Sequence, residues 1–304
     1  MSISSDPIFE QFKRYKGPVP EGSIAVDFLG TMVRREFIPS SIEPSTPVVE
    51  TIYPQANEDI FAWVDLLNAV LKAGDSFTMM ELGAGYGIWS VRAAKAIQQR
   101  RGIPFKLVAI EAEPQHFAWL QIHFADNGLN PADHTLVAAA VSDQPGTALF
   151  YIASPDAEAS RPNEWWGQSL IKDYESVGEV TGKCHQGHAV AVLQSGWQSV
   201  EVAKVTLNDL LVSHSLVDFI HMDIQREELP VVRASIEALN QKVKFLHIGT
   251  HSEEIEDGLK EILNLHGWQC RADFAGGGTR STSYGDLAFQ DGVQSWANPR
   301  LGGE

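Results

Sequence analysis

Apolar runs of strand length recur along the chain, separated by stretches in which apolar positions return at helical spacing. Buried strands are predicted at residues 77–82, 106–111, 135–142, 217–223 and 243–249. After the first run, apolar residues recur at helical spacing from Ile88 onward, which predicts a helix. Glu113 and Pro114 indicate the start of a second helix after the next run. This alternation favours a mainly parallel sheet covered by helices.

The residues before the first run form a separate predicted unit. Residues 1–75 are rich in proline, so much of this part is expected to be extended or looped. One helical pattern lies within it at 57–71, with Asn57 as the predicted N-cap. We interpret residues 1–75 as a cap or lid segment that precedes the main domain.

The main domain is predicted to comprise residues 76–304 and to contain an insertion. The connection between the third and fourth strands is too long for a single crossover, so residues 144–204 form this insertion. Extra strands are predicted within it at 147–152 and 199–204.

Turn and capping signals organise the last part of the chain. Thr250 and Glu253 have the spacing of a capping box for a helix that Gly267 ends. Two late strands, at 268–274 and 286–290, lie on either side of a glycine loop.

A glycine turn follows the first predicted strand. Glu81 precedes Gly83, Gly85 and Gly87 in the pattern E-x-G-x-G-x-G, and such glycines let the backbone approach a ligand closely. A dinucleotide site prefers G-x-G-x-x-G, and Ile88 occupies its third glycine position here. An acidic residue before the turn also suits a ligand with an ammonium group better than a pyrophosphate. The pattern resembles the first motif of class I S-adenosylmethionine-dependent methyltransferases.

Polar residues end the second and third predicted strands. Glu111 closes an apolar run, where a carboxylate can accept both ribose hydroxyls of an adenosine. The alternative for Glu111 is an ordinary solvated acid at a strand end. In the methyltransferase pattern the third strand end lies beside the adenine, so Ser142 and Asp143 are candidates for contacts to its amino group. Asp143 also begins a good turn sequence that needs no ligand.

Composition limits the partners. The net charge of −16 disfavours nucleic acid and anionic lipid, because an acidic surface repels phosphate groups. Cys184 and Cys270 are too few for a disulfide framework. No apolar run approaches membrane-spanning length, and the N-terminus lacks a signal-peptide pattern. We therefore expect a cytoplasmic protein without nucleic-acid or membrane partners, and whether it forms a homo-oligomer is left open.

Three segments together resemble the FkbM family of S-adenosylmethionine-dependent methyltransferases. They are the glycine turn at 80–87, a V-T-L-x-D-L pattern at 205–211 and the strand that ends in aspartate at 217–223. The resemblance covers residues 50–295 approximately. It implies a Rossmann-like α/β sheet, parallel with a closing antiparallel hairpin, and helices on both faces. It also implies O-methylation of hydroxyls on sugars, polyketides or similar small metabolites.

The resemblance assigns S-adenosylmethionine as the cofactor. Glu81 is then expected at the methionine amino group and Glu111 at the ribose. The cofactor backbone is expected along Gly83, Gly85, Tyr86 and Gly87.

One departure from the family concerns the loop after the aspartate, which usually reads D-x-E-G-x-E. Here Gln225 replaces a carboxylate and Arg226 replaces the glycine, while Glu228 keeps the last position.

The carboxyl ends of the fourth and fifth strands carry the catalytic candidates. These strands are neighbours in the expected order, and ligands of open α/β sheets lie beyond such ends. Asp223 ends the fourth strand, with a helix cap as its alternative role. His251 follows the fifth and is the candidate general base, because imidazole titrates near neutrality. Holding a loop in place is the alternative role of His251.

A metal is not predicted from the sequence. A divalent cation could bridge Asp223 and the acceptor oxygen, but Asp223 and His251 are too few ligands to claim it. Cys184, His185 and His188 lack a fourth partner for a zinc site.

An acceptor wall is predicted in the insertion, where aromatic faces and polar groups lie close in sequence. Its candidate residues are Trp165, Trp166, Gln168 and Ser169. They equally fit a tryptophan-rich insertion that anchors itself. The sequence thus predicts methyl transfer to oxygen on a small polar acceptor. Rival functions are N-methylation of a small amine, a dehydrogenase, which Ile88 disfavours, and non-catalytic binding of S-adenosylmethionine.

Overall fold

The computed structural model of the chain describes residues 6–20, 23–38, 48–100, 102–153, 168–171 and 177–303. Its centre is a seven-stranded sheet in the order β15-β18-β14-β13-β5-β6-β7. These strands are β5 (Phe77–Leu82), β6 (Phe105–Glu111), β7 (Thr135–Ala138), β13 (Val217–Met222), β14 (Val243–Thr250), β15 (Gln269–Phe274) and β18 (Gly292–Ala297). The first five are parallel, and β18 runs antiparallel to both β14 and β15. The predicted fold class is thereby confirmed.

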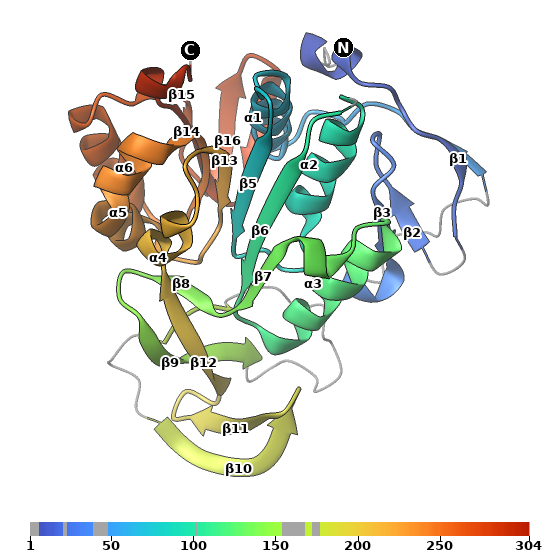
Figure 1. Cartoon of the computed structure of the whole chain (residues 1–304). Helices are drawn as coiled ribbons and strands as arrows, with labels where there is room; N and C mark the ends of the chain where they lie inside the picture. Colours follow the sequence, from blue (N-terminus) through green and yellow to red (C-terminus); the bar gives the residue numbers. More distant parts are fainter. Residues whose placement is uncertain are drawn as a thin grey trace.

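Helices cover both faces of this sheet (Figure 1). One layer contains α1 (Ile60–Leu71), α2 (Ile88–Gln98) and α3 (Pro114–Asp126). The opposite layer contains α4 (Leu207–Val212), α5 (Glu228–Lys242) and α6 (Glu253–Leu265). Because α1 packs with α2 against the sheet, the predicted boundary at residue 75 cuts through this layer. The lid role of the N-terminal segment stays a prediction.

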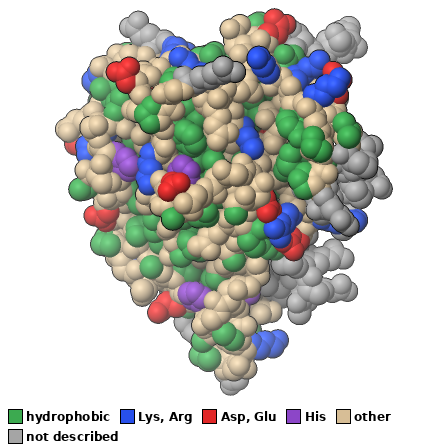
Figure 2. Space-filling view, turned by 45° about the vertical axis from the view of Figure 1, so that its right-hand side comes forward, with side chains coloured by type: hydrophobic (Ala, Val, Ile, Leu, Met, Phe, Trp, Pro, Cys, Tyr) green, Lys and Arg blue, Asp and Glu red, His purple; other side chains and the backbone are tan. Residues whose placement is uncertain are grey.

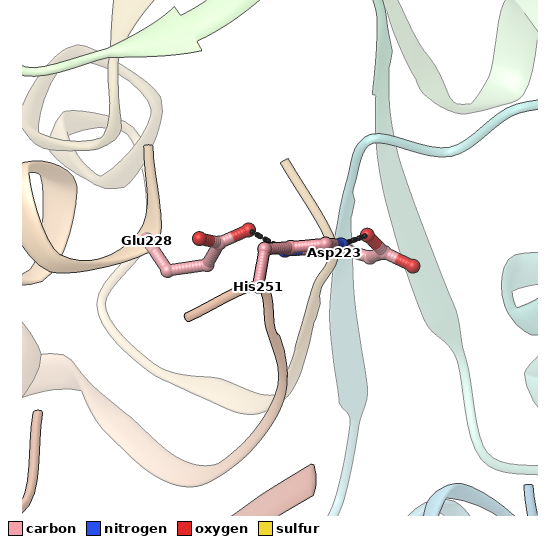
Figure 3. A group of neighbouring side chains, drawn as sticks. All are labelled: Asp223, Glu228 and His251. Carbon is pink, nitrogen blue, oxygen red and sulfur yellow. Dashed lines mark hydrogen bonds and ion pairs between the residues drawn. The ribbon is translucent and has the colours of Figure 1, made fainter. Parts of the chain in front are cut away.

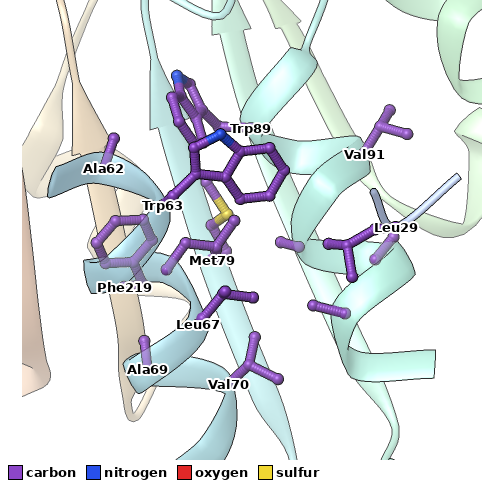
Figure 4. Packing of buried hydrophobic residues seen from close by; sticks show 14 of the residues in the cluster. Leu29, Ala62, Trp63, Leu67, Ala69, Val70, Met79, Trp89, Val91 and Phe219 are labelled. Atoms are coloured by element: carbon purple, nitrogen blue, oxygen red, sulfur yellow. The ribbon is translucent and has the colours of Figure 1, made fainter. Parts of the chain in front are cut away.

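Burial on both faces explains why the central strands read as continuous apolar runs. Every residue of β13 is buried, as expected for a parallel strand with helices on each side. Phe219 belongs to the cluster beneath α1, where Met79 and Trp63 also lie (Figure 4). Its neighbour Ile220 belongs to the cluster beneath α5. This two-sided packing fixes which strand ends lie side by side.

The insertion and the short strand before it build a second sheet at the carboxyl end of the central one (Figure 1). Its strands are β8 (Ala140–Ser142), β9 (Gly146–Ala153), β10 (Val177–His185), β11 (His188–Leu193) and β12 (Gln198–Thr206). The strands predicted at 147–152 and 199–204 correspond to β9 and β12, which pair antiparallel. The third apolar run proves to be two strands. The chain leaves the central sheet at Ala139, whose N–H donates to the Glu111 carbonyl at 3.0 Å, and β8 then pairs with β12.

The strand that closes the central sheet was not predicted. Residues 286–290 instead belong to an outer hairpin formed by β16 (Gly278–Thr282) and β17 (Gly285–Phe289). The closing strand is β18, which lies between β14 and β15. The order of apolar and polar residues alone could not show that β18, rather than β17, closes the central sheet.

Two predicted helix caps are wrong. Ser252 caps α6 and accepts the Ile255 N–H, so Thr250 and Glu253 do not form the capping box. Asp59 occupies the N-cap position of α1 rather than Asn57, and its side chain makes no capping hydrogen bond. The helices themselves lie where the apolar spacing predicted them.

Short elements complete the fold. β1 (Lys16–Pro18) pairs with β4 (Val48–Glu50), and β2 (Ser23–Val26) pairs with β3 (Met32–Arg34). Single 3-10 turns lie at Pro7–Gln11, Arg35–Phe37, Pro131–Asp133 and Pro299–Leu301. On the face drawn in Figure 2, acidic and basic side chains lie scattered among polar and apolar ones. Within the described ranges, none of the helices combines the length and apolar character needed to cross a membrane.

The core packing predicts the effect of shortening Phe219. This side chain is fully buried, so Phe219→Ala removes its contacts and leaves a cavity beneath α1. We expect the free energy of unfolding to fall by about 3–5 kcal/mol. Urea denaturation measures this change, and Leu265→Ala, at a side chain that is 80% exposed, is the control with an expected change below about 0.5 kcal/mol. Equal effects of the two substitutions would contradict the assigned packing.

Candidate active site

The turn between β5 and α2 requires its three glycines. Gly83, Gly85 and Gly87 have φ values of 76°, 55° and 77°, in the left-handed region that side chains disfavour. A Cβ at Gly83 would lie 1.8 Å from the backbone oxygen of Asp223. The Asp223 N–H in turn donates to the Leu82 carbonyl at 2.9 Å. The glycine turn therefore packs directly on the end of β13.

Glu81 lies beneath this turn and caps α2. Its carboxylate accepts the backbone N–H groups of Trp89 at 3.0 Å and Ser90 at 2.8 Å, which have no partner within the helix. Burial raises the pKa of Glu81 to about 7, although these hydrogen bonds oppose the rise. The side chain is 1% exposed and does not line the cavity beside the turn. This position does not support the predicted contact between Glu81 and a ligand amino group.

A cavity opens beside the glycine turn, and we call it the turn cavity. It is bounded by the turn, the end of β6, the crossing from β7 to β8, part of the insertion and the loop after β13. The lining residues are Gly83, Gly85, Ile110, Glu111, Ala112, His116, Ala139, Ala140, Val141, Phe150, Gln168, Leu170, Asp223, Ile224 and Gln225. The structure thus brings five predicted residues to one cavity, namely Gly83, Gly85, Glu111, Gln168 and Asp223.

Glu111 is the buried acid of this cavity. Its carboxylate accepts the N–H of Gly85 at 2.6 Å and that of Glu113 at 2.7 Å. Burial raises the pKa of Glu111 to about 7; the backbone hydrogen bonds oppose the rise and the charge of Glu113 adds to it. Each carboxylate oxygen has a second lone pair. Glu111 can therefore hold the turn and still accept a hydrogen bond from a ligand.

Several predicted residues lie away from the turn cavity. The Tyr86 ring stacks on Phe37, with centroids 5.6 Å apart. Gly87 begins α2, and its missing Cβ makes room for Leu120. Neither residue lines the turn cavity.

The crossing of the chain at Ala139 changes which residues of the third strand end face the turn cavity. Residues 139–141 line it, whereas Ser142 and Asp143 do not. The Ser142 hydroxyl instead donates to Asp143 at 3.2 Å. Ser169 meets β9 through its backbone carbonyl and is not a lining residue. Trp165 and Trp166 lie outside the described residues.

Asp223, His251 and Glu228 lie in a row, with the imidazole between the two carboxylates (Figure 3). Nε2 of His251 is 3.3 Å from Oδ1 of Asp223, and Nδ1 is 2.9 Å from Oε1 of Glu228. Glu228 is fully buried, whereas the Asp223 side chain is 43% exposed. The row therefore runs from the protein interior to the turn cavity.

The row determines the charge of the imidazole in the free protein. Burial lowers the pKa of His251, but the hydrogen bonds and charges of Asp223 and Glu228 outweigh burial and raise it to about 10. Burial raises the pKa of Asp223, but the hydrogen bond and charge of His251 bring it below its usual value. A ring that already carries its proton cannot take another, so this arrangement does not support His251 as the general base.

The loop after β13 is strained and holds the row in place. Gln225 and Arg226 have φ values of 51° and 81°, and Arg226 stands where the family pattern has a glycine. The Glu228 carboxylate accepts the N–H groups of Ile224 and Arg226, each at 3.1 Å. The Gln225 amide reaches back to Oδ1 of Asp223 at 3.2 Å and to Nε2 of His251 at 2.8 Å. Gln225 was not among the predicted site residues, and its departure from the family pattern was the only signal.

His251 lines a second cavity, here called the polar cavity. It is lined by Thr250, His251, Ser252, Glu253, Glu256, Asp257, Lys260, Ala275, Gly276, Gly277, Arg280, Gln290, Asp291 and Gly292. The two cavities share no lining residue. Asp223 lines one and His251 lines the other, so their contact lies at the boundary between the cavities.

The candidate zinc cluster is not assembled. Nε2 of His185 contacts Glu113, and Nδ1 of His188 contacts the Glu201 carbonyl. Cys184 is an exposed free thiol. In the part of the chain that the structure describes, the acidic and histidine groups close enough to share a cation are Asp223, Glu228 and His251.

The strand order and the glycine turn define an open α/β fold with a cavity at the carboxyl ends of its strands, where folds of this kind bind ligands. The family model of the methyltransferase FkbM domain matches residues 81–274, and the chain belongs to this family of methyltransferases. A protein of Jannaschia sp. (strain CCS1), named "Putative methyltransferase", is 27% identical over 290 residues, which are 94% of this chain and 96% of that protein.

Solved structures show more distant likenesses. One is methyltransferase FkbM from Methylobacillus flagellatus KT, with 14% identity, a TM-score of 0.41 and coverage of 80% of this chain and 56% of that chain. Another is precorrin-6y C5,15-methyltransferase from Geobacter metallireducens GS-15, with 13% identity, a TM-score of 0.40 and coverage of 80% and 92%. At these values neither likeness indicates a substrate.

The packing of the glycine turn predicts a large effect of Gly83→Ala. The new Cβ would collide with the backbone of Asp223 and would adopt an unfavourable φ, so we expect a loss of at least about 2 kcal/mol in unfolding free energy. Gly74→Ala is the matched control, since Gly74 has open space around it and should change stability by less than about 1 kcal/mol. Thermal denaturation compares the two, and an unaffected Gly83→Ala protein would contradict the close approach.

Proposed function

We propose that the protein transfers a methyl group from S-adenosylmethionine to a hydroxyl oxygen of a small polar metabolite. The observation that carries this proposal is the position of Asp223, which lines the turn cavity and contacts His251, a lining residue of the polar cavity. The family supports methyl transfer, and the two cavities support separate places for donor and acceptor.

The turn cavity fits the donor. The bare backbone at Gly83 and Gly85 allows close approach of a ligand, and Glu111 offers a buried carboxylate with lone pairs to spare. Such an acid at the end of the second strand suits a pair of ribose hydroxyls. Residues 139–141 provide apolar surface for a base. When bound, S-adenosylmethionine supplies an activated methyl group, so the protein has mainly to align the reactants.

The polar cavity supports a hydroxylated acceptor. Its wall combines hydroxyl, amide, carboxylate and cationic side chains, including those of Ser252, Gln290, Asp291 and Lys260. Such groups bind hydroxyl-rich molecules through hydrogen bonds. Together with the net charge of −16, they support a small-molecule acceptor rather than nucleic acid.

Asp223 is the proposed partner of the reacting hydroxyl. A hydroxyl becomes a better nucleophile as its proton leaves. A carboxylate held in place can accept a hydrogen bond from the hydroxyl and so assist this loss. His251 and Gln225 hold Oδ1 of Asp223, while the side chain remains partly exposed to the turn cavity. In this proposal His251 is a positioning residue, and the acceptor proton does not pass to it.

The pKa of Glu111 predicts a pH dependence of donor affinity. A protonated Glu111 has lost the charge that attracts two ribose hydroxyls, so affinity falls as pH drops below its pKa of about 7. The ionised fraction changes about tenfold between pH 8 and pH 6, and we expect the dissociation constant for S-adenosylmethionine to rise by about that factor.

Calorimetric titration at the two pH values tests this dependence. Compared with the unmodified protein, Glu111→Gln should bind S-adenosylmethionine more weakly at pH 8 and with nearly the same affinity at pH 6. Glu237→Gln, at an exposed position of α5, should behave as the unmodified protein at both pH values. A pH dependence that survives in Glu111→Gln would show that a group other than Glu111 causes it.

Removing the charge of Asp223 should affect turnover more than donor binding. We expect Asp223→Asn to lower kcat by at least about 100-fold. The reason is that a neutral amide lacks the negative charge with which the carboxylate draws the proton from the acceptor hydroxyl. The affinity for S-adenosylmethionine should change by less than about threefold. Formation of S-adenosylhomocysteine with a panel of hydroxylated metabolites and amines gives the readout, with Asp75→Asn at an exposed loop as control. Turnover with amines alone would replace the oxygen acceptor by nitrogen.

A further inference from the structure

Three polar atoms converge at the boundary between the two cavities. They are Oδ1 of Asp223, Nε2 of His251 and the side-chain amide of Gln225. Their separations are 3.3 Å between Asp223 and His251, 3.2 Å between Asp223 and Gln225, and 2.8 Å between Gln225 and His251. Two ligands at neighbouring corners of an octahedral site lie about 3.0 Å apart when each metal bond is about 2.1 Å. The triangle therefore has the size of one face of an octahedron.

We infer that Asp223, Gln225 and His251 form one face of an octahedral site for a divalent cation, Mg²⁺ or Mn²⁺. Two oxygen ligands and one imidazole suit these hard cations, which retain water or substrate oxygen at their other positions. The Gln225 amide presents its nitrogen toward the triangle here, and a half-turn of the amide presents its oxygen. With the amide turned, all three atoms can offer a lone pair to one cation.

Glu228 completes the arrangement from behind the ring. Its Oε1 lies 2.9 Å from Nδ1 of His251 and holds a proton there, so a cation at Nε2 takes the place of the proton that this nitrogen carries in the metal-free protein. Figure 3 shows Glu228 and Asp223 on opposite sides of the imidazole, so Glu228 orients the ligand and does not share the cation face. The carboxylate is itself fixed by the backbone N–H groups of Ile224 and Arg226.

The strained loop supports the same assignment. Gln225 and Arg226 adopt consecutive left-handed conformations although neither is a glycine. Strain of this kind costs about 1–3 kcal/mol for each residue and persists at functional sites. Here it turns the Gln225 side chain back over Asp223, which an unstrained continuation of the strand would not do. With a neutral ring, the carboxylates of Asp223 and Glu228 leave two negative charges for the cation to balance.

This inference rests on the proposed function for its chemical role. A cation held by Asp223, Gln225 and His251 would bind the acceptor hydroxyl and lower its pKa. The O–H proton would leave through its hydrogen bond to the Asp223 carboxylate, a bond would form between that oxygen and the methyl carbon, and the methyl–sulfur bond would break to leave a neutral thioether. Asp223 and Gln225 line the turn cavity and His251 lines the polar cavity, so the triangle lies where residues of the two cavities touch.

Binding of Mn²⁺ to the metal-free protein tests the site without donor or acceptor. Electron paramagnetic resonance of free Mn²⁺ should show one saturable site from which Mg²⁺ displaces it. Asp223→Asn and Gln225→Leu should each weaken binding at least about tenfold. Gln225→Glu adds a charged oxygen ligand and should tighten binding by about tenfold or more. A nitrogen coupling to the bound Mn²⁺ should disappear in His251→Gln.

Controls separate this inference from the proposed function. Asp75→Asn should bind Mn²⁺ as the unmodified protein does, and circular dichroism checks that each variant is folded. Gln225 lies in a partly exposed loop, so its two variants keep the test valid if His251→Gln unfolds. Absence of a saturable Mn²⁺ site, or equal affinity in both Gln225 variants, overturns the inference. Calorimetry with S-adenosylmethionine on the same protein reports separately on the donor site.

Discussion

Two buried carboxylates hold the glycine turn, and the donor half of the site depends on them. Glu81 accepts the first free N–H groups of α2, and Glu111 accepts the N–H of Gly85. Each charge-assisted hydrogen bond contributes about 1.5–3 kcal/mol, which offsets the cost of removing a carboxylate from water. Burial nevertheless raises the pKa of both acids, so the hydrogen bonds compensate only part of that cost.

The glycine turn also joins the donor half to the acceptor half. Gly83 touches the Asp223 backbone, and Asp223 begins the row that continues through His251 to Glu228. Parallel order makes this contact unavoidable, because β5 and β13 are neighbours and end at the same edge. A single edge of the sheet therefore sets both the proposed place of the methyl donor and the position of the Asp223–His251 contact.

Much of this edge could be predicted from sequence, because continuous apolar runs mark buried parallel strands and the acids follow directly. Glu111 and Asp223 fell at the right strand ends for that reason. The rest depended on pairing between distant segments. The split at Ala139 follows from the pairing of β8 with β12, which no local pattern reveals, so the turn cavity is lined by residues 139–141 rather than by Ser142 and Asp143. The charge of His251 likewise depends on Glu228, which a helix start brings beneath it.

The two cavities, which share no lining residue, have a consequence for the order of events in catalysis. In the proposed arrangement donor and acceptor occupy different cavities, so they do not have to pass each other. Neither product then blocks the exit of the other, so a random sequence of addition and release is compatible with this architecture. In an enzyme built in this way, bound S-adenosylhomocysteine would not hold back the methylated metabolite. The turnover rate would then depend separately on the concentrations of donor and acceptor.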